Sequence, residues 1–211
     1  MQRGRFITLE GGEGAGKSTQ ARLLAAALTD LGVPVLSTRE PGGVPGAEEL
    51  RALLLSGRIA WSAPAETLLH FAARAEHVAK AIRPALAAGA WVVCDRFADS
   101  TMAYQGYGQG ADREMIATLT RLIGLAPDVT IVLDVSAGVA LARRRARGGT
   151  ADRYERQNAA FHARVNEGFR AIAGADPQRC VLVQADGPEA AVHAAVMRAV
   201  WQRLPLLAPP L

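Results

Sequence analysis

Eight consecutive residues near the N-terminus have the spacing of a phosphate-binding loop. Residues 11–18 read GGEGAGKS and match the pattern G-x-x-x-x-G-K-[ST] in full. Glycines let the backbone curl around an anion, and a helix that begins near Lys17 adds the positive end of its dipole. In such loops the lysine contacts the β- and γ-phosphates, and the serine hydroxyl is a ligand of Mg²⁺. We therefore predict a site for a nucleoside triphosphate and Mg²⁺ that consists of Gly11, Gly12, Glu13, Gly14, Ala15, Gly16, Lys17, Ser18 and Thr19.

Two further segments carry side chains suited to phosphate or metal binding. Residues 38–43 read TREPGG, where Arg39 and the rigid turn after it suit a second anion, although an ordinary turn also fits. Asp95 and Arg96 directly follow an apolar run. Asp95 could hold Mg²⁺ or its waters, or orient a hydroxyl, and Arg96 could bind a phosphate with two hydrogen bonds. A plain ion pair between the two at the surface is the alternative.

Short apolar runs alternate with longer helical patterns along the chain, and this order predicts where these segments meet. The runs of strand length are residues 6–9, 33–38, 91–94, 129–133 and 181–183. Runs that are apolar on both faces indicate a parallel sheet covered by helices on both sides. We predict an α/β fold of three layers, with a five-stranded parallel sheet and ligands at the carboxyl ends of its strands.

Helical patterns fill the gaps between the apolar runs. One begins at the phosphate loop and covers residues 17–31, and the longest covers residues 65–88, where Pro84 predicts a kink or break. No repeat or low-complexity linker divides the chain, so we predict a single domain over residues 1–211.

The composition excludes several classes of protein. The chain has 211 residues, of which 50% are hydrophobic and 21% charged, whereas disordered chains are poor in apolar residues. The longest uncharged apolar run, residues 84–94, is far shorter than the ~20 residues of a membrane span, and the N-terminal residues show no secretion signal. Two widely spaced cysteines, Cys94 and Cys180, fit a reducing, cytoplasmic compartment, and we expect both to be inert buried thiols at strand ends.

The positive charge of the chain is carried almost entirely by arginine. The net charge is +4 and the pI is about 9.6, which fits either a solvated basic surface or nucleic-acid binding. Lysine occurs only at positions 17 and 80. Six arginines gather in one short stretch: Arg143, Arg144, Arg145, Arg147, Arg153 and Arg156.

Together these motifs resemble the nucleoside monophosphate kinases, and further segments narrow the resemblance to the bacterial thymidylate kinase family. Those segments are TREPGG at 38–43, FAAR at 71–74, DRF at 95–97, STMAYQG at 100–106, PDVT at 127–130 and LDV at 133–135. The resemblance extends from Phe6 to about Phe169. It implies a P-loop kinase that transfers a phosphoryl group from ATP to dTMP with Mg²⁺, in the synthesis of dTTP for DNA replication. It also implies a homodimer whose partners are small molecules, and neither nucleic acid nor a membrane.

The resemblance assigns roles in binding the nucleotide base. Phe71 would stack on the thymine ring. Arg74, three residues further on the same helix face, would donate to a thymine carbonyl. Thr101 and Gln105 resemble positions that hydrogen-bond the base. Without the family, Phe71 would be a core residue and Arg74 a solvated one.

Other residues resemble contacts to the sugar and phosphate. Tyr104 would pack under the deoxyribose, where a 2′-hydroxyl would be crowded, and Glu13 would receive the 3′-hydroxyl. Arg96 would bind the substrate phosphate, and Arg39 is a second candidate for an anion. Arg51 resembles an arginine that closes the pocket, although an ion pair with Glu48 on the same helix is equally compatible.

The arginine-rich stretch resembles the lid of this family, and we place the lid at about residues 143–156. Some members carry a catalytic arginine in the phosphate loop and others in the lid; here Glu13 is followed by Gly14, so the lid must supply it. Arg147 precedes a Gly148–Gly149 pair that resembles a hinge, and residues 152–153 resemble the lid's Asp-Arg pair. Their spacing departs from the commoner R-G-x-x-D-R form by about one residue, which leaves Arg147 and Arg153 as alternatives. A solvated basic helix is the other interpretation.

The predicted catalytic residues are thus Lys17, Asp95, Arg96, Arg147 and Arg153, with Ser18 and Asp95 at the metal. Rival functions are a deoxynucleoside kinase, another nucleoside monophosphate kinase, a regulatory nucleotide-binding module and a basic nucleic-acid-binding ATPase. No N-K-x-D tetrapeptide is present, which disfavours a GTPase switch. The four histidines show no metal-ligand grouping, and we expect His70 and His77 at the surface.

Overall fold

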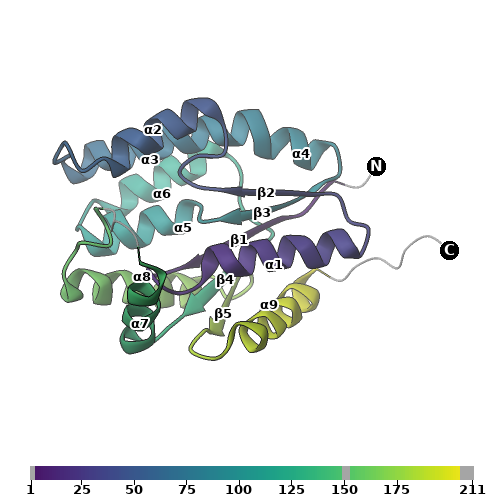
Figure 1. Cartoon of the computed structure of the whole chain (residues 1–211). Helices are drawn as coiled ribbons and strands as arrows, with labels where there is room; N and C mark the ends of the chain where they lie inside the picture. The colour runs from purple at the N-terminus through teal and green to yellow at the C-terminus, as the bar shows by residue number, and fades with distance from the viewer. Residues whose placement is uncertain (1–2, 149–152, 205–211) are drawn as a thin grey trace.

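The computed structural model describes residues 3–148 and 153–204. Five parallel strands form one sheet in the order β2-β3-β1-β4-β5 (Figure 1). The strands are β1 (Phe6–Gly11), β2 (Val35–Arg39), β3 (Trp91–Asp95), β4 (Val129–Asp134) and β5 (Cys180–Gln184). The predicted five-stranded parallel α/β fold is confirmed, and each strand begins and ends within two residues of its predicted bounds.

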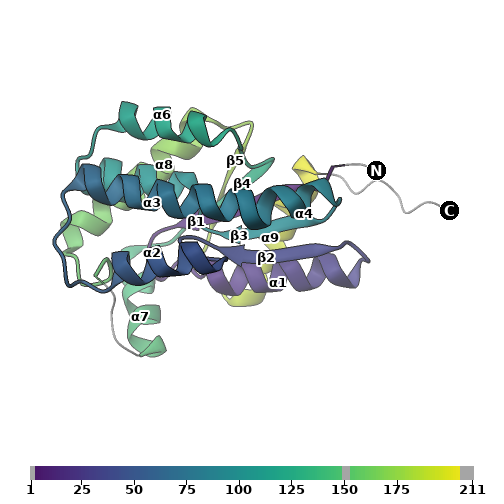
Figure 2. The same cartoon turned by 90° about the horizontal axis from the view of Figure 1, so that it is seen from above.

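Helices connect the strands and cover both faces of the sheet. The described helices are α1 (Lys17–Asp30), α2 (Pro45–Leu55), α3 (Ala63–His77), α4 (Arg83–Ala87), α5 (Ala98–Thr101), α6 (Arg113–Ile123), α7 (Ala137–Arg147), α8 (Ala159–Ala175) and α9 (Glu189–Arg203), with π-helical segments η1 (Val78–Ile82) and η2 (Met102–Gly108). Helices α1 and α9 lie on one face, and α4, α5 and α8 lie on the other (Figures 1 and 2). Within the described residues, no helix is both long and apolar enough to cross a membrane.

The core lies on both sides of the central strands. All six residues of β1 are buried, as expected for a strand that helices cover on both faces. Leu24 of α1 and Val196 of α9 pack against Ile131 on one face, and Phe6 and Ile82 pack together on the other. Ile7 and Leu9 of β1 belong to the first cluster and Phe6 to the second, so apolar contacts on both faces position the strand from which the phosphate loop begins.

The order of the strands creates a crevice at their carboxyl ends. Strand β1 lies between β3 and β4, with Leu9 paired to Asp95 on one side and Gly11 paired to Leu133 on the other. The chain leaves β1 through α1 to reach β2, which lies beyond β3. Loops that leave neighbouring strands in different directions open a crevice at this edge, which is where ligands bind in such sheets.

The long helical region around Pro84 continues without a break. It consists of α3, η1 and α4, and the π-helical turn ends at Ile82, two residues before the proline. The N–H of Arg83 donates to the carbonyl of Val78, five residues back. Because proline has no N–H and its ring crowds the preceding turn, a locally wider turn lets the helix pass it. The predicted irregularity therefore takes the form of a π turn.

Both cysteines are free, buried thiols, as predicted. Cys94 is the penultimate residue of β3 and Cys180 is the first residue of β5. Burial raises the pKa of the Cys94 thiol well above its usual value and that of Cys180 to about 12. Neither thiol ionises near neutral pH, which makes both unreactive.

Candidate active site

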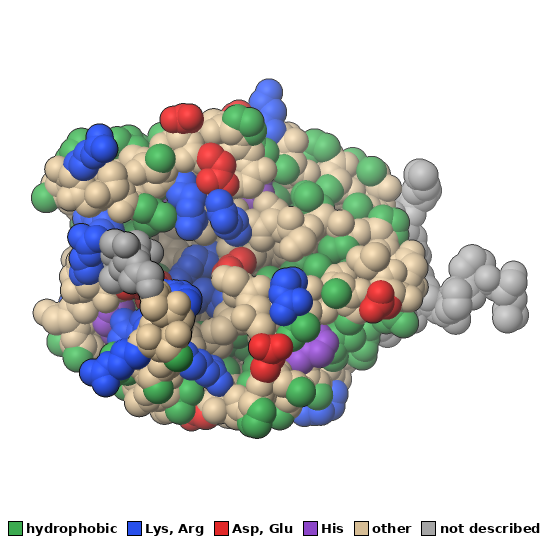
Figure 3. Space-filling view, in the orientation of Figure 1, with side chains coloured by type: hydrophobic (Ala, Val, Ile, Leu, Met, Phe, Trp, Pro, Cys, Tyr) green, Lys and Arg blue, Asp and Glu red, His purple; other side chains and the backbone are tan. Residues whose placement is uncertain are grey.

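A cleft of about 900 Å³ lies at the carboxyl ends of the strands and contains most of the predicted site residues. Figure 3 shows the hollow with Lys and Arg side chains around and inside it. The predicted residues that line it are Glu13, Gly14, Ala15, Gly16, Lys17, Ser18, Thr19, Arg39, Arg51, Arg74, Asp95, Arg96, Thr101, Tyr104, Gln105 and Arg147. Segments far apart in sequence therefore meet in one site.

The phosphate loop connects β1 to α1 as its sequence predicts. Gly16 has a left-handed backbone and caps α1, so the first turn of that helix opens toward the cleft. The Lys17 ammonium is almost buried and donates to the carbonyl of Gly12 at 2.7 Å. Burial, reinforced by nearby Arg96, lowers the pKa of Lys17 to about 8. The loop thus presents N–H groups and a desolvated cation to an anion.

Gly14 has a packing role that excludes a side chain. Its φ is +79°, and a Cβ there would lie 2.5 Å from the carbonyl oxygen of Ala140 in α7. The loop and α7 are therefore in close contact at the residue that follows Glu13. An arginine after Glu13 would need both a strained backbone and a displaced α7.

Ser18 and Asp95 form a pair of oxygen ligands beside the loop. The hydroxyl of Ser18 donates to Oδ2 of Asp95 at 2.5 Å. Oδ1 of Asp95 is buried and has no hydrogen-bond partner among residues 3–148 and 153–204. Hard oxygen donors of this kind suit Mg²⁺, which usually takes one or two protein ligands and completes its shell with water and phosphate oxygens. The residues present therefore fit the predicted metal.

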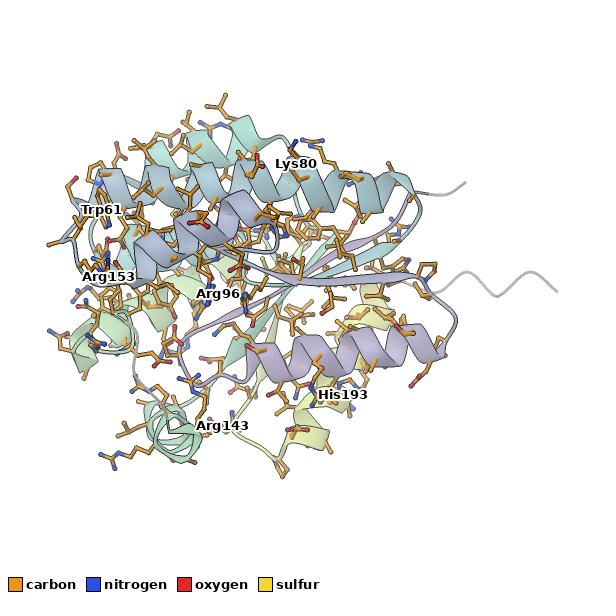
Figure 4. The ribbon with its side chains drawn as sticks, turned by 45° about the horizontal axis from the view of Figure 1, so that its top comes forward. Trp61, Lys80, Arg96, Arg143, Arg153 and His193 are labelled. Atoms are coloured by element: carbon orange, nitrogen blue, oxygen red, sulfur yellow. The ribbon has the colours of Figure 1, made fainter. Side chains whose placement is uncertain are left out.

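Arg96 lies in the centre of the cleft and is held by the groups around it (Figure 4). Its guanidinium donates to Oε1 of Glu13 at 2.6 Å and to the hydroxyl of Tyr104 at 3.1 Å. It also contacts Ser100 at 3.2 Å, and its backbone has a φ of +73°. Burial alone would raise the pKa of Glu13, but Arg96, Lys17 and the Tyr104 hydrogen bond lower it to about 2. Glu13 is therefore ionised at neutral pH.

Glu10 contacts the residues that follow Arg96, a role that the sequence did not predict. Its side chain is fully buried, accepts from the backbone N–H of Phe97 at 2.7 Å and from the hydroxyl of Ser100 at 2.6 Å. These bonds hold the residues on the C-terminal side of the strained Arg96 backbone. Burial, together with Asp99, raises the pKa of Glu10 to about 8. An acidic residue inside an otherwise apolar strand was the available signal.

Arg74 belongs to a buried polar cluster at the floor of the cleft. Its Nε donates to Oε2 of Glu40 at 2.7 Å. Its Nη2 donates to the carbonyl of Phe97 at 3.0 Å and to the hydroxyl of Thr101 at 3.1 Å. Its Nη1 is buried and has no partner in the part of the chain that the structure describes. A buried donor without a partner in the protein suits an acceptor on a ligand.

The prediction that His77 lies at the surface is wrong. His77 is completely buried, its Nδ1 lies 3.1 Å from Oε1 of Glu40, and its Nε2 lies 2.8 Å from the hydroxyl of Thr38. It falls on the inner face of α3, one turn beyond Arg74, and so holds the same glutamate. Tertiary packing places a polar cluster here that a helical pattern does not reveal.

His70 contributes a flat ring to the cleft, which also differs from its predicted surface position. It is half-buried, lines the cleft four residues before Arg74, and lies 2.9 Å from the hydroxyl of Tyr154. Burial, and after it the positive charges of Arg74 and Arg96, lowers the pKa of His70 to about 3, so the ring is neutral. Residues four apart lie on the same face of a helix. The predicted base contact Arg74 was therefore the signal in the sequence for His70.

Phe71 does not line the cleft in this structure. Its side chain is buried, and its ring lies 4.7 Å from the guanidinium of Arg74, which it supports from behind. Contact between Phe71 and a base therefore stays a prediction.

Two arginines at the rim have partners of their own. Arg39 pairs with Glu48 at 3.2 Å, and Glu48 also accepts from the N–H of Gly43. Arg51 donates to the carbonyl of Pro41 at 2.7 Å. Both arginines line the cleft and keep the TREPGG turn in position.

The predicted lid residues occupy two different places. Arg143, Arg144 and Arg147 of α7 line the cleft, and Arg147 pairs with Glu155. Arg153 instead forms an ion pair with the buried Glu66 at 2.8 Å, and Figure 4 shows it on the side of the molecule where Trp61 lies. Gly149 and Asp152 of the predicted hinge and Asp-Arg pair lie outside the described residues.

Comparisons with known proteins agree on one family. A family model described as thymidylate kinase matches residues 9–196. Curated thymidylate kinases of Gluconobacter oxydans and Caulobacter vibrioides are 58% and 51% identical to the chain, and the matches cover 96% and 98% of it and 96% and 100% of those proteins. A solved structure of thymidylate kinase from Ehrlichia chaffeensis has a TM-score of 0.78 at 36% identity, covering 94% of this chain and 99% of that one.

Proposed function

This chain belongs to the thymidylate kinase family and phosphorylates dTMP to dTDP, and we propose how its cleft does so. ATP, the donor that the family implies, binds with its phosphates on the loop at Lys17. The dTMP phosphate meets it at Arg96, and the thymine extends toward Gln105. The position of Arg96 supports this arrangement most strongly, because it contacts both Glu13 of the phosphate loop and Tyr104 of the base end.

The acceptor in this reaction is already a nucleophile. A phosphate oxygen of dTMP needs no strong general base, so catalysis rests on alignment and on neutralising charge. Lys17 and Arg96 both line the cleft and lower the pKa of Glu13, and they would contact the donor and acceptor phosphates respectively. Asp95 holds Ser18 at the loop and keeps a carboxylate oxygen beside the phosphates.

Mg²⁺ would be held by the hydroxyl of Ser18 and the carboxylate of Asp95. When bound, it would neutralise charge on the donor phosphates. The orphaned Oδ1 of Asp95 supports this assignment, since a buried carboxylate oxygen requires a partner.

The nucleoside of dTMP is recognised by groups on α3 and η2. Arg74 offers Nη1 to a thymine carbonyl, and Thr101 and Gln105 complete the base contacts. The ionised Glu13 accepts the sugar 3′-hydroxyl, and Tyr104 packs beside the deoxyribose.

We assign the catalytic lid arginine to Arg147 and not to Arg153. Arg147 lines the cleft, whereas Arg153 is held by Glu66. The carbonyl of Ala140, which lies against Gly14, supports a lid origin, because the loop has no room for an arginine after Glu13. The lid would also exclude water from the transferred phosphoryl group.

A homodimer is supported by exposed leucines on three adjacent helices. Leu53 of α2, Leu68 of α3 and Leu122 of α6 are 37%, 49% and 76% exposed, and the helices lie next to one another (Figure 2). Sedimentation of the wild type and of Leu68→Glu would test this: the variant should sediment as a monomer and the wild type as a dimer.

The reaction itself is tested by offering nucleoside monophosphates and nucleosides with Mg-ATP and identifying the products. We expect dTDP from dTMP, with dTMP the preferred acceptor. Formation of dTMP from thymidine, with dTMP left unphosphorylated, would instead identify a deoxynucleoside kinase.

A further inference from the structure

We propose that Glu66 is a positioning residue that fixes the amide of Gln105 and thereby sets which edge of the base the cleft accepts. The proposal rests on the function proposed above, because it concerns how dTMP is selected. Glu66 does not line the cleft, and no role follows for it from the phosphate loop or the family motifs.

Glu66 is a completely buried carboxylate that gathers donors from two other parts of the fold. Its Oε2 lies 2.8 Å from Nη1 of Arg153. Its Oε1 accepts from Nε2 of Gln105 at 2.9 Å, from Nε2 of Gln109 at 2.8 Å and from the hydroxyl of Tyr154 at 2.7 Å. The hydrogen bonds are all to Oε1, and Arg153 adds the opposite charge beside Oε2, so the buried carboxylate is stabilised only while the three donors point toward Oε1.

The carboxylate determines which way the Gln105 amide faces. A carboxylate paired with a guanidinium acts as an acceptor of hydrogen bonds, so the amide must present its N–H group to Glu66. The side-chain hydrogen bonds of Gln105 among the described residues are all donated by Nε2, to Glu66 and, at 3.3 Å, to Tyr154. Since Gln105 lines the cleft, its Oε1 is the atom left for a ligand, and that atom is an acceptor.

An acceptor at this point complements the donor supplied by Arg74. Thymine presents an N–H at position 3 beside its carbonyl at position 4, whereas cytosine presents an acceptor and an amino group at these positions. Nη1 of Arg74 would meet the thymine carbonyl and Oε1 of Gln105 the adjacent N–H. Cytosine would be mismatched at both positions, and Glu66 sets the second of them.

The variant Glu66→Gln tests this directly. The new amide has a single oxygen, which can face either Arg153 or the three Oε1 donors. An NH₂ group opposes the guanidinium, so the oxygen turns to Arg153 and the NH₂ group faces Gln105, which then turns its own N–H group to the cleft. We expect the KM for dTMP to rise about 10-fold to 100-fold, because a donor would then face the N–H of thymine. The KM for ATP should stay unchanged, and kcat/KM for dCMP should not fall, so the preference for dTMP shrinks.

Two further variants separate positioning from simple support of the fold. Gln105→Leu removes the amide, so adding Glu66→Gln to it should leave the KM for dTMP within about twofold. Gln109→Leu removes another donor to the same carboxylate atom without changing a cleft residue, and should keep the wild-type preference. Two results together would overturn the proposal. The effects of Glu66→Gln and Gln105→Leu on the KM for dTMP would multiply in the double variant, and Glu66→Gln would keep the wild-type ratio of dTMP to dCMP activity.

A structure of the wild-type protein with dTMP provides a test that does not depend on any variant folding. Oε1 of Gln105 should lie within hydrogen-bond distance of N3 of thymine, with Nε2 still on Glu66. A complex in which Nε2 faces the base would refute the role of Glu66. Wild-type protein that turns over no dTMP at all would instead refute the proposed function.

Discussion

The guanidinium of Arg74 and the carboxylate of Glu40 form an ion pair at 2.7 Å, with side chains only 2% and 3% exposed. Three of the contacts of Arg74 lie inside the protein and fix its plane, while Nη1 is left for a ligand. One residue of the predicted base site is therefore also a structural member of the core. Substituting it affects both selectivity and stability, and the two effects need separate measurements.

Arg74→Ala is expected to reduce the preference for dTMP over dCMP. The guanidinium only donates hydrogen bonds, so it suits the thymine carbonyl and opposes the cytosine amino group. Losing it should lower kcat/KM for dTMP about 10²-fold and bring the dTMP to dCMP ratio toward unity. The single variant also leaves Glu40 without its ion pair, at a cost of about 3 to 5 kcal/mol in the free energy of unfolding.

The double variant Arg74→Ala with Glu40→Gln separates these effects. Replacing the buried charge should recover much of the stability in urea unfolding but none of the selectivity. A single variant that loses activity on both nucleotides equally would show that Arg74 only shapes the pocket.

The pH dependence of ATP use should report Lys17. Burial lowers its pKa to about 8 in the free protein, so the cation is present below that pH and is lost above it. We expect kcat/KM for ATP to fall as the pH rises through about 8. Lys17→Ala should lower kcat/KM for ATP on the order of 10²-fold at neutral pH and remove the decrease above about pH 8. Lys80→Ala removes the other lysine and is the matched control; a wild-type profile that stays level to pH 10 would contradict this prediction.

Arg147→Ala and Arg153→Ala should behave differently. Arg147 lines the cleft, so we expect kcat to fall roughly 10²- to 10³-fold with little change in the KM for dTMP, because the contact forms mainly in the transition state. Arg153→Ala should chiefly lower the melting temperature, since it leaves the buried Glu66 without its ion pair. Wild-type kcat in Arg147→Ala, beside a large loss in a folded Arg153→Ala, would reverse the assignment.

His70 and Phe71 offer a direct comparison of which ring contacts the base. His70 lines the cleft and Phe71 is buried behind Arg74, so we expect His70→Ala to raise the KM for dTMP about tenfold and His70→Phe to restore it. Because the pKa of His70 is lowered to about 3, the wild-type KM should show no step near pH 6.5. Phe71→Leu should lower thermal stability and leave KM almost unchanged; a rise in KM confined to that variant would favour Phe71 at the base.

The phosphate loop and the positions of the strands along the chain were predictable from the sequence, because both depend on local signals, whereas the order of the strands in the sheet came only from the structure. The GGEGAGKS segment needs only its own glycines and the following helix to form an anion site, and β1 and β4 are short apolar runs with few alternatives. The meeting of Arg39, Arg96 and Lys17 at one edge also followed, since parallel strands in one sheet place their carboxyl ends together.

Which side chains face the cleft was decided only by the tertiary structure. The sequence placed Phe71 and Arg74 on one face of a helix, but the packing of α3 against α2, α6 and η2 turns His70 and Arg74 to the cleft and buries Phe71. The carboxylates of Glu10, Glu40 and Glu66 show the same limit. Only the place of Glu10 in an apolar run is a signal in the sequence; for all three, the fold alone brings the carboxylate out of water beside donors that are distant along the chain. Burial makes each of these hydrogen bonds strong and obligatory, and burial is a property of the assembled layers.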